Sequence, residues 1–348
     1  MKMADRLARS FPYAFARVSA MKARLIAKDE YHKLLRMDLA GITRYLQDSD
    51  YKEPITELSA TYQGIELVDQ ALKADLTKVY SKLRRICPEE VVAVVDLYLE
   101  RADMQNLKIV LRALFSNVKE EEFTYLLEPW GKYDEGHYRA LFNLGAIDEA
   151  LKRSGILSEK DAREAYETYK SSTRMIELEN YLDMAYYNKA IQGALSLKMH
   201  GRAFSDFLLE EIDVLNIKNL LRFKSEGLEP AQIVRHIIPG GLRLRETQLK
   251  KLAGAESEDS LRSSLARTYY GKVLDFKGKI TDIELELKKY HLRSGYLKSH
   301  QNPLSIEGIL SYMLSKELEI SNLRTIVKAK HLDIDPGFVE KSLMVMAK

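Results

Sequence analysis

The chain has 348 residues, of which 46% are hydrophobic and 30% are charged, a composition typical of globular proteins with a substantial apolar core. Its 54 Lys and Arg residues nearly balance its 51 Asp and Glu residues, so the net charge of +3 gives no argument for a nucleic-acid partner. The single cysteine, Cys87, excludes an internal disulfide bond and fits a reducing compartment. Length alone predicts two or three domains.

The N-terminal 30 residues lack the apolar stretch of a secretory signal. The best apolar run, "VVAVVDLYL", carries Asp96 and is far shorter than the ~18 residues of a membrane-spanning helix. We therefore expect a chain that is not embedded in a bilayer, although it could bind at a membrane surface.

The fold class follows from the rarity of helix-breaking residues. The 8 Pro and 17 Gly residues together make 25 of 348, about 7% of the chain, against the usual ~12%. No segment shows sustained alternation of β-branched residues. The sequence therefore predicts an all-α protein with long helices.

The predicted helices begin with one before residue 30. From Ile55 to Leu83 the apolar residues recur in steps of three and four, which predicts one continuous helix of roughly 45 Å. Pro54 stands at its first turn, and Pro88 ends it. Similar long helical patterns cover residues 163–195 and 279–297.

One short helical pattern occurs three times. It consists of an acid, Asn three residues later, then Leu or Ile, then Lys or Arg, and a second basic residue four positions further on. The three copies are Asp103, Asn106, Lys108 and Arg112; Asp213, Asn216, Lys218 and Arg222; and Glu319, Asn322, Arg324 and Lys328. The asparagines are 110 (216 − 106) and 106 (322 − 216) residues apart.

Two other markers recur in the same order. An L-x-x-S sequence starts at Leu46, Leu151 and Leu261, and "PWG" at Pro129 is followed 110 residues later by "PGG" at Pro239. A period near 108 residues exceeds the 20–50 residues of solenoid repeats, and each unit is large enough for its own core.

We therefore predict three similar helical domains with pseudo-three-fold internal symmetry, each beginning with a short helix near L-x-x-S and ending on the repeated acid-x-x-Asn helix. The predicted boundaries are 1–30 for an additional N-terminal helix, and 31–128, 129–240 and 241–348 for the three repeats.

The repeated acid lies on the apolar side of its helix. At about 100° per residue, Asp103 falls about 40° from Leu107, whereas Lys108 and Arg112 lie on the opposite flank. The motif is therefore either a ligand or catalytic site, or a polar lock that fixes how the helix packs. We favour packing, because three copies of one enzyme site are unusual and no nucleophile or His stands beside the acid. Asp103 and Asp213 should then be buried and accept hydrogen bonds from backbone N–H groups or a neighbouring Lys or Arg.

Sequence motifs for nucleotide binding, metal binding or catalysis are also missing. The sequence has no G-x-x-x-x-G-K-[ST], no G-x-G-x-x-G and no H-E-x-x-H, and its seven histidines form no metal-spaced pair. Gly240 and Gly241 are typical of a turn, and "KLRR" at 82–85 is typical of a solvated helix end rather than a nucleic-acid patch. We therefore predict no catalytic, cofactor-binding or metal-binding residue, and an interaction protein rather than an enzyme.

Three stretches resemble the C subunit of archaeal A-type and bacterial V-type ATP synthases, the relative of the d subunit of eukaryotic vacuolar ATPases. They are "YAFARVSAMKARLIAKDEYHKLLRMD", "DMQNLKIVLRA" and "DVLNIKNLLRFKSEGL", and the resemblance covers essentially the whole chain. The third copy departs from the pattern, because Glu319 replaces Asp, and Arg324 and Lys328 stand for the usual Lys and Arg. This departure leaves the packing of the third domain open.

The resemblance implies a funnel of three helical domains, present once per complex, at the cytoplasmic face of the cell membrane. As a peripheral central-stalk subunit it would cap the proteolipid rotor ring of c/K subunits and receive the D and F subunits of the shaft. It would pass torque to the catalytic A and B subunits during proton or sodium transport coupled to ATP synthesis or hydrolysis. It would perform no chemistry itself and need no cofactor.

Two other classes remain open. One is an α-helical scaffold or adaptor unrelated to a rotor. The other is a helical nucleic-acid binder, which needs a basic face that the balanced composition does not show. The partner that co-purifies with the chain would distinguish the three.

Overall fold

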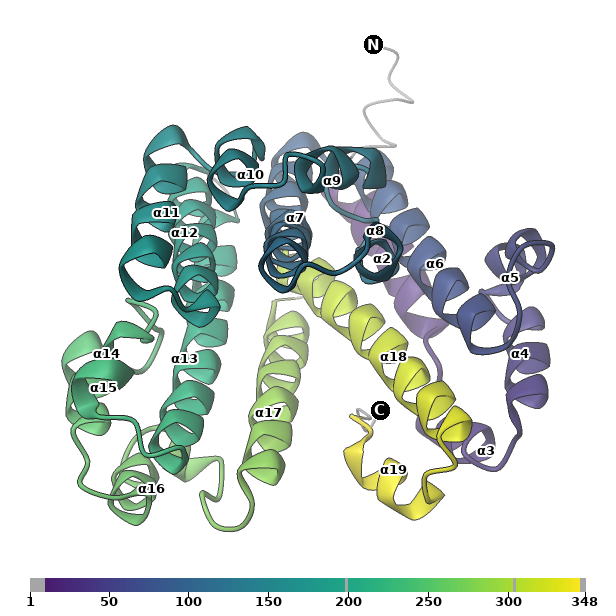
Figure 1. The fold of residues 1–348 in the computed structure, drawn as a ribbon. Helices are drawn as coiled ribbons and strands as arrows, with labels where there is room; N and C mark the ends of the chain where they lie inside the picture. The colour runs from purple at the N-terminus through teal and green to yellow at the C-terminus, as the bar shows by residue number, and fades with distance from the viewer. Residues whose placement is uncertain (1–9, 198–199, 303–304, 345–348) are drawn as a thin grey trace. The chain divides into compact units, whose positions relative to one another are not determined.

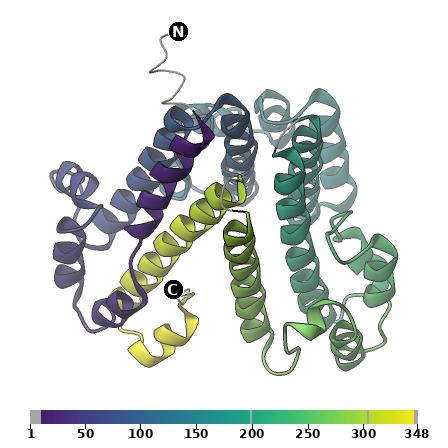
Figure 2. The same cartoon turned by 180° about the vertical axis from the view of Figure 1, so that it is seen from behind.

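The computed structural model describes residues 10–197, 200–302 and 305–344, and in these ranges the chain is helical and contains no strand (Figure 1; Figure 2 gives the view from behind). The prediction of an all-α fold is confirmed. None of the helices in these ranges combines the length and the apolar character that crossing a bilayer requires.

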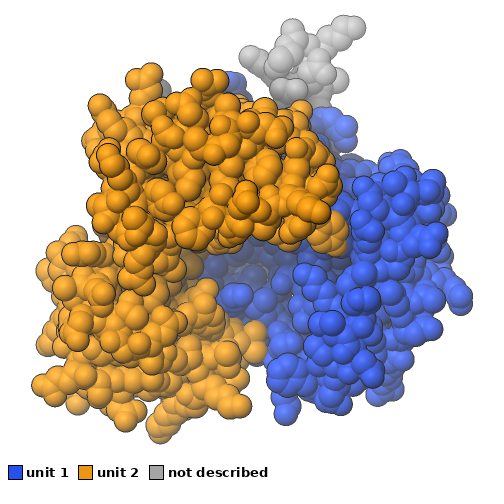
Figure 3. All heavy atoms as spheres, in the orientation of Figure 1, with its two compact units in different colours: residues 1–92, 288–348 blue, residues 93–287 orange. Residues whose placement is uncertain are grey.

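The chain divides into two compact units, coloured separately in Figure 3. Unit 1 consists of residues 1–92 and 288–348, and unit 2 consists of residues 93–287. The chain passes from one unit to the other within α7 (Glu89–Ser116) and again within α17 (Ile280–Gln301).

Unit 1 is organised around one long helix, α18 (Glu307–His331), which contacts α2, α4, α6 and α19. Both ribbon views show α2 running beside α18 (Figures 1 and 2). The other complete helices of this unit are α2 (Phe11–Ala23), α3 (Lys28–Leu34), α4 (Leu39–Gln47), α5 (Lys52–Leu58), α6 (Gly64–Ile86) and α19 (Pro336–Ser342).

Unit 2 has α13 (Gly201–Ser225) in the corresponding position, in contact with α12, α14, α15 and α16. Its other elements are α8 (Glu120–Thr124), α9 (Glu135–Phe142), α10 (Ile147–Arg153), α11 (Glu159–Ser172), α12 (Met175–Ser196), α14 (Pro230–Arg235), α15 (Glu246–Ala253), α16 (Glu258–Ala266) and the 3₁₀ helix η1 (Tyr270–Lys272).

Side-chain caps fix where several helices start, because a Ser or Asp oxygen satisfies a backbone N–H that the first turn leaves free. Asp38 caps α4 through Gly41, and Ser158 caps α11 through Asp161. The L-x-x-S leucines lie in short helices, as predicted, because Leu46 belongs to α4, Leu151 to α10 and Leu261 to α16.

The prediction of one continuous helix from Ile55 to Leu83 is wrong. Helix α5 ends at Leu58 and α6 begins at Gly64, whose φ of 58° lies in the left-handed region that favours glycine. The two helices pack against each other. The apolar residues of α5 and α6 face the same core, so the spacing of three and four residues continues in the sequence although the helix is interrupted.

The long pattern at residues 163–195 is likewise two helices rather than one. Thr173 has a φ of 54°, which ends α11, and α12 starts at Met175. The pattern at residues 279–297 is confirmed, because α17 covers Ile280–Gln301.

Candidate functional site

The three copies of the repeated motif lie on α7, α13 and α18, the first two in unit 2 and the third in unit 1. The acid and the asparagine of every copy are at most 4% exposed. We call each such acid and asparagine, together with the groups that bind them, a lock. Buried polar groups need hydrogen-bond partners. The asparagines have equivalent partners in all three copies, whereas the partners of the acid differ between the first two copies and the third.

The asparagines make the same contact three times. Each side-chain amide donates to the carbonyl, and accepts from the N–H, of a single residue 22 positions further along the chain. The partners are Glu128 for Asn106, Ile238 for Asn216 and Met344 for Asn322, at 2.8–3.0 Å. The asparagine therefore holds the chain that follows its helix against that helix.

The carboxylate of Asp103 accepts hydrogen bonds from neutral donors. The backbone N–H of Lys132 lies 2.9 Å from both oxygens, the N–H of Tyr133 lies 3.2 Å from one of them, and the Tyr138 hydroxyl donates at 2.8 Å. The prediction that this acid is buried and accepts backbone hydrogen bonds is confirmed.

Asp213 repeats this arrangement, and the same prediction is confirmed for it. It accepts from the backbone N–H groups of Arg243 (2.7 Å) and Leu244 (3.2 Å) and from the Tyr270 hydroxyl (2.9 Å). Burial raises the pKa of Asp213 to about 6, although the hydrogen bonds from Arg243 and Tyr270 act to lower it.

A glycine allows the backbone to approach the carboxylate in both of these locks. A Cβ atom placed on Gly131 would lie 2.2 Å from Oδ1 of Asp103, and one on Gly241 would lie 2.2 Å from Oδ1 of Asp213. These are the final glycines of "PWG" and "PGG", which explains why the two tripeptides recur 110 residues apart. Gly240 and Gly241, for which the sequence predicts a turn, lie outside any helix, with φ values of 97° and 142°.

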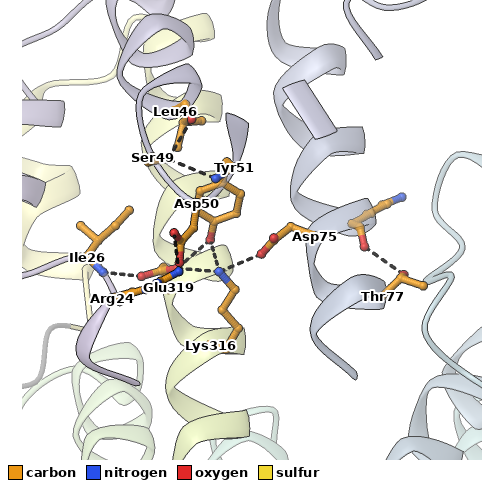
Figure 4. Close-up of polar contacts among 11 residues, drawn as sticks. Arg24, Ile26, Leu46, Ser49, Asp50, Tyr51, Asp75, Thr77, Lys316 and Glu319 are labelled. Carbon is orange, nitrogen blue, oxygen red and sulfur yellow. Dashed lines mark hydrogen bonds and ion pairs between the residues drawn. The ribbon is translucent and has the colours of Figure 1, made fainter. Parts of the chain in front are cut away.

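The third lock is built from distant parts of the chain (Figure 4). Glu319 accepts from the backbone N–H of Ile26 at 2.5 Å, from the Tyr51 hydroxyl at 2.7 Å and from Nζ of Lys316 at 2.9 Å. Lys316 also donates to the Tyr51 hydroxyl at 2.9 Å and lies 2.8 Å from Oδ2 of Asp75. One buried ammonium therefore serves two buried carboxylates.

Electrostatics support this ion cluster. Burial acts to lower the pKa of Lys316, but the charges of Glu319 and Asp75 outweigh it and raise that pKa above its ordinary value. Burial raises the pKa of Asp75, although the charge of Lys316 acts against it. Oδ2 of Asp75 lies 2.8 Å from Nζ of Lys316, so the two groups form an ion pair.

The basic residues of the motif reach carboxylates on other helices. Lys108 donates to Asp183 on α12 at 2.7 Å, and Arg324 donates to Asp69 on α6 at 2.8 Å. Arg112 and Arg222 each bind one glutamate through two nitrogens, Glu179 on α12 and Glu284 on α17. Lys218 is half-buried and Lys328 is exposed.

The partners follow a cyclic order when they are assigned to the predicted repeats. The partners described above for the acid and the basic residues of the first copy lie within 129–240, and those of the second lie within 241–348. Those of the third, apart from Lys316, lie within 1–128, the predicted N-terminal helix and first repeat. Each acid is held by at least three donors, an arrangement that favours packing over ligand binding. In the residues that the structure describes, no group of three or more His, Cys, Asp or Glu side chains is placed to hold a metal ion.

Sequence reasoning missed Ile26, Tyr51, Asp75 and Lys316. One signal was available for the lysine: three residues before the acid, the first two copies have Glu100 and Glu210, whereas the third has Lys316. A basic residue at a position that is acidic in the other two copies indicates that Lys316 binds a negatively charged partner.

Known proteins with similar sequences agree with the resemblance of the three stretches. The chain is 33% identical to the C subunit of the A-type ATP synthase of Methanosarcina barkeri, over 97% of this chain and 93% of that protein. It is 30% identical to the protein of the same name from Haloferax volcanii (96% and 97% covered) and 29% identical to that of Archaeoglobus fulgidus (97% of each). The model of the family described as ATP synthase (C/AC39) subunit matches residues 14–341. The chain therefore belongs to the ATP synthase (C/AC39) subunit family.

Proposed function

We propose that this chain is a non-catalytic central-stalk subunit of an A/V-type ATP synthase. It links the membrane rotor ring of proteolipid subunits to the D and F subunits of the shaft and transmits torque between them. One copy acts in each complex, at the cytoplasmic face of the membrane. The observation that carries the proposal is the similarity to the C subunits of A-type ATP synthases over about 97% of the chain.

The three locks support this role physically. A torque coupler must resist bending and twisting, and it needs no tuned nucleophile or base. Buried carboxylates with several fixed donors oppose sliding of the helices that they join, because any displacement leaves a buried charge without partners. Close-packed helices deform little, so a load applied at one end of α18 or α13 reaches the other.

Reconstitution tests the proposal. Membranes carrying the A-type complex, depleted of the native subunit, should recover ATP-driven proton or sodium transport when the purified chain is added. The recovered complex should contain the proteolipid ring and the D and F subunits together with this chain. Failure to bind such membranes, with capture of unrelated partners instead, would favour the adaptor class and overturn the proposal.

A second measurement addresses catalysis. The isolated chain should neither bind nor hydrolyse ATP, because its sequence has no phosphate-binding loop. Turnover that persists after removal of contaminating ATPases would contradict the assignment as a non-catalytic subunit.

A further inference from the structure

A cavity of about 660 Å³ lies in unit 1 and adjoins the third lock. Its walls come from α2, the segment after α2, α3, the C-terminal part of α17 and α18. Its apolar wall includes Phe15, Val18, Leu25, Leu318 and Met344. The volume falls within the range of about 300–1,000 Å³ that is typical of small-molecule sites.

Two lysines line the cavity, the exposed Lys28 and the half-buried Lys22, and the contacts of Lys22 are with neutral groups. Its Nζ atom donates to Oγ of Ser311 at 3.1 Å and lies 4.6 Å from the centroid of the Tyr296 ring. Across the described ranges no carboxylate lies within ion-pair distance of Lys22. The ammonium therefore has no counter-ion within the part of the chain that the structure describes.

Among the described residues that line the cavity, Glu319 is the one carboxylate, and it does not serve Lys22. Glu319 is already engaged by Ile26, Tyr51 and Lys316. Lys22 is half-buried, and burial lowers the pKa of its ammonium group. A cation in such surroundings is stabilised by any anion that can enter, because the Coulomb interaction is stronger where water is scarce.

The position of the cavity relates it to the first two locks. There, the loop that follows the asparagine's partner returns to the acid, and a glycine of that loop lies against the carboxylate. In the third copy the acid receives its backbone donor from Ile26 instead, and Glu319, Asn322 and Met344 all line the cavity. A molecule in the cavity would therefore lie directly against the third lock.

We propose that this cavity binds a single-chain anionic amphiphile, with its hydrocarbon chain against the apolar wall and its anionic head at Lys22. The hydroxyl group of Ser19 and the imidazole of His300 lie at the same cavity and supply further hydrogen-bonding groups for the head. A carboxylate and a phosphate monoester head share this chemistry. The proposal does not depend on the proposed function.

Calorimetric titration of the full chain tests it, with dodecanoate below its micellar concentration as the probe. We expect one dodecanoate per chain. Dodecanol lacks the charge and should bind about tenfold more weakly or worse, because a charge-assisted hydrogen bond is lost. Inorganic phosphate alone should not bind measurably. Saturable binding of phosphate alone, or equal affinity for dodecanol and dodecanoate, would overturn the proposal.

Matched variants locate the site. Lys22→Met should weaken dodecanoate binding about tenfold or more. Lys52→Met, which removes an exposed lysine from α5 in the same unit, should leave it unchanged. Ser19→Phe should abolish binding by filling the cavity, and it breaks no hydrogen bond among the described contacts. Unaltered binding in both Lys22→Met and Ser19→Phe would overturn the proposal.

A shortened chain excludes a competing occupant. A variant that ends at Met344 should bind dodecanoate with the affinity of the full chain. Binding that is seen only after this truncation would mean that the removed residues, and not an amphiphile, occupy the cavity, and the proposal would fail.

Discussion

The first two locks and the third solve the same problem with different chemistry. Asp103 and Asp213 are satisfied by neutral donors from the chain that follows their helices, 29–57 residues away. Glu319 takes donors 293 and 268 residues away and adds a buried ammonium three residues before it. A local lock therefore needs only backbone and a hydroxyl group, whereas the lock that joins distant parts of the chain uses net charge as well.

The difference also concerns geometry. In the local locks a glycine lets the backbone reach a short Asp side chain. In the distant lock the longer Glu side chain reaches the backbone of Ile26. The additional methylene group of Glu319 thus replaces the close approach that Gly131 and Gly241 provide.

The largest effect should come from removing the cation of the third lock. Lys316→Met leaves Glu319 and Asp75 buried without their common partner, and we expect the free energy of unfolding to fall by about 3–5 kcal/mol. Urea unfolding of the isolated chain measures it. The triple variant that adds Glu319→Gln and Asp75→Asn should recover part of the loss. A loss below about 1 kcal/mol would show that the cluster contributes little.

Asp213 should make stability depend on pH, because burial raises the pKa of its carboxyl group in the folded state. Its folded pKa of about 6 lies above its ordinary value of 3.8, so the folded state holds the proton more tightly. The stability contributed by this group is fully present below about pH 4 and is lost as the pH rises through about 6, a change of about 2–3 kcal/mol. Urea titrations of wild type and Asp213→Asn at pH 4.5 and 7 measure it. The free energy of unfolding of the wild type, relative to that of the variant, should be larger at pH 4.5 than at pH 7. An equal difference at both pH values would contradict the prediction.

Truncating the local acids should have a smaller effect than removing Lys316. Asp103→Ala and Asp213→Ala each leave two backbone N–H groups and a tyrosine hydroxyl without their acceptor, and we expect a loss of about 1–3 kcal/mol. Thermal melts of the isolated variants measure it. An unchanged melting temperature in both, together with failed assembly, would instead place these acids at an interface.

The glycines of the local locks should be sensitive to a single methyl group. Gly131→Ala places a Cβ atom 2.2 Å from Oδ1 of Asp103, and we expect about 1–2 kcal/mol of destabilisation from the forced shift. Gly136→Ala, at a helical position where the closest other atom would be 3.4 Å from the new Cβ, is the matched control. In the Asp103→Ala background the cost of Gly131→Ala should shrink, because the clashing atom is gone. Full additivity in that double-mutant cycle would refute the steric explanation.

The smallest effects belong to the exposed arginines. Arg112 and Arg222 are about half exposed at their side chains, so their ion pairs with Glu179 and Glu284 are screened by water. Arg112→Ala and Arg222→Ala should each cost less than about 1 kcal/mol by urea unfolding. Arg324→Ala should cost more, because Arg324 and Asp69 are 24% and 10% exposed. A smaller loss for Arg324→Ala than for the other two variants would show that burial does not determine how much these ion pairs contribute to stability.

Much of this arrangement could be predicted from the sequence, because it rests on local periodicity. The all-α fold, the recurrence of the motif and the burial of Asp103 and Asp213 follow from helical spacing and from the position of the acid on the apolar side. The breaks at Gly64 and Thr173 could not be predicted that way, because two helices that share one core preserve a single apolar pattern.

The partners of Glu319 could not be predicted either. Ile26 contributes only its backbone N–H group, which is present in every residue except proline, so its side chain carries no signal. The three tyrosines share no spacing from the L-x-x-S leucine of their own repeat: Tyr51 lies 5 residues after Leu46 (51 − 46), Tyr138 lies 13 before Leu151 (151 − 138) and Tyr270 lies 9 after Leu261 (270 − 261). Contacts between segments so far apart in the sequence depend on how those segments pack, and a search for motifs does not detect them.

The third lock also sets an order of events during synthesis. Tyr51 leaves the ribosome 268 residues before Glu319 does, so the region around Ile26 and Tyr51 must wait for nearly all of translation before its buried acceptor exists. The two local locks can form soon after their helices emerge, since their partners follow within 57 residues. A chain that stops before α18 would contain the first two locks but not the third, so its N-terminal region would lack the contacts with Glu319. Proteases would therefore cleave such incomplete chains more readily than complete ones.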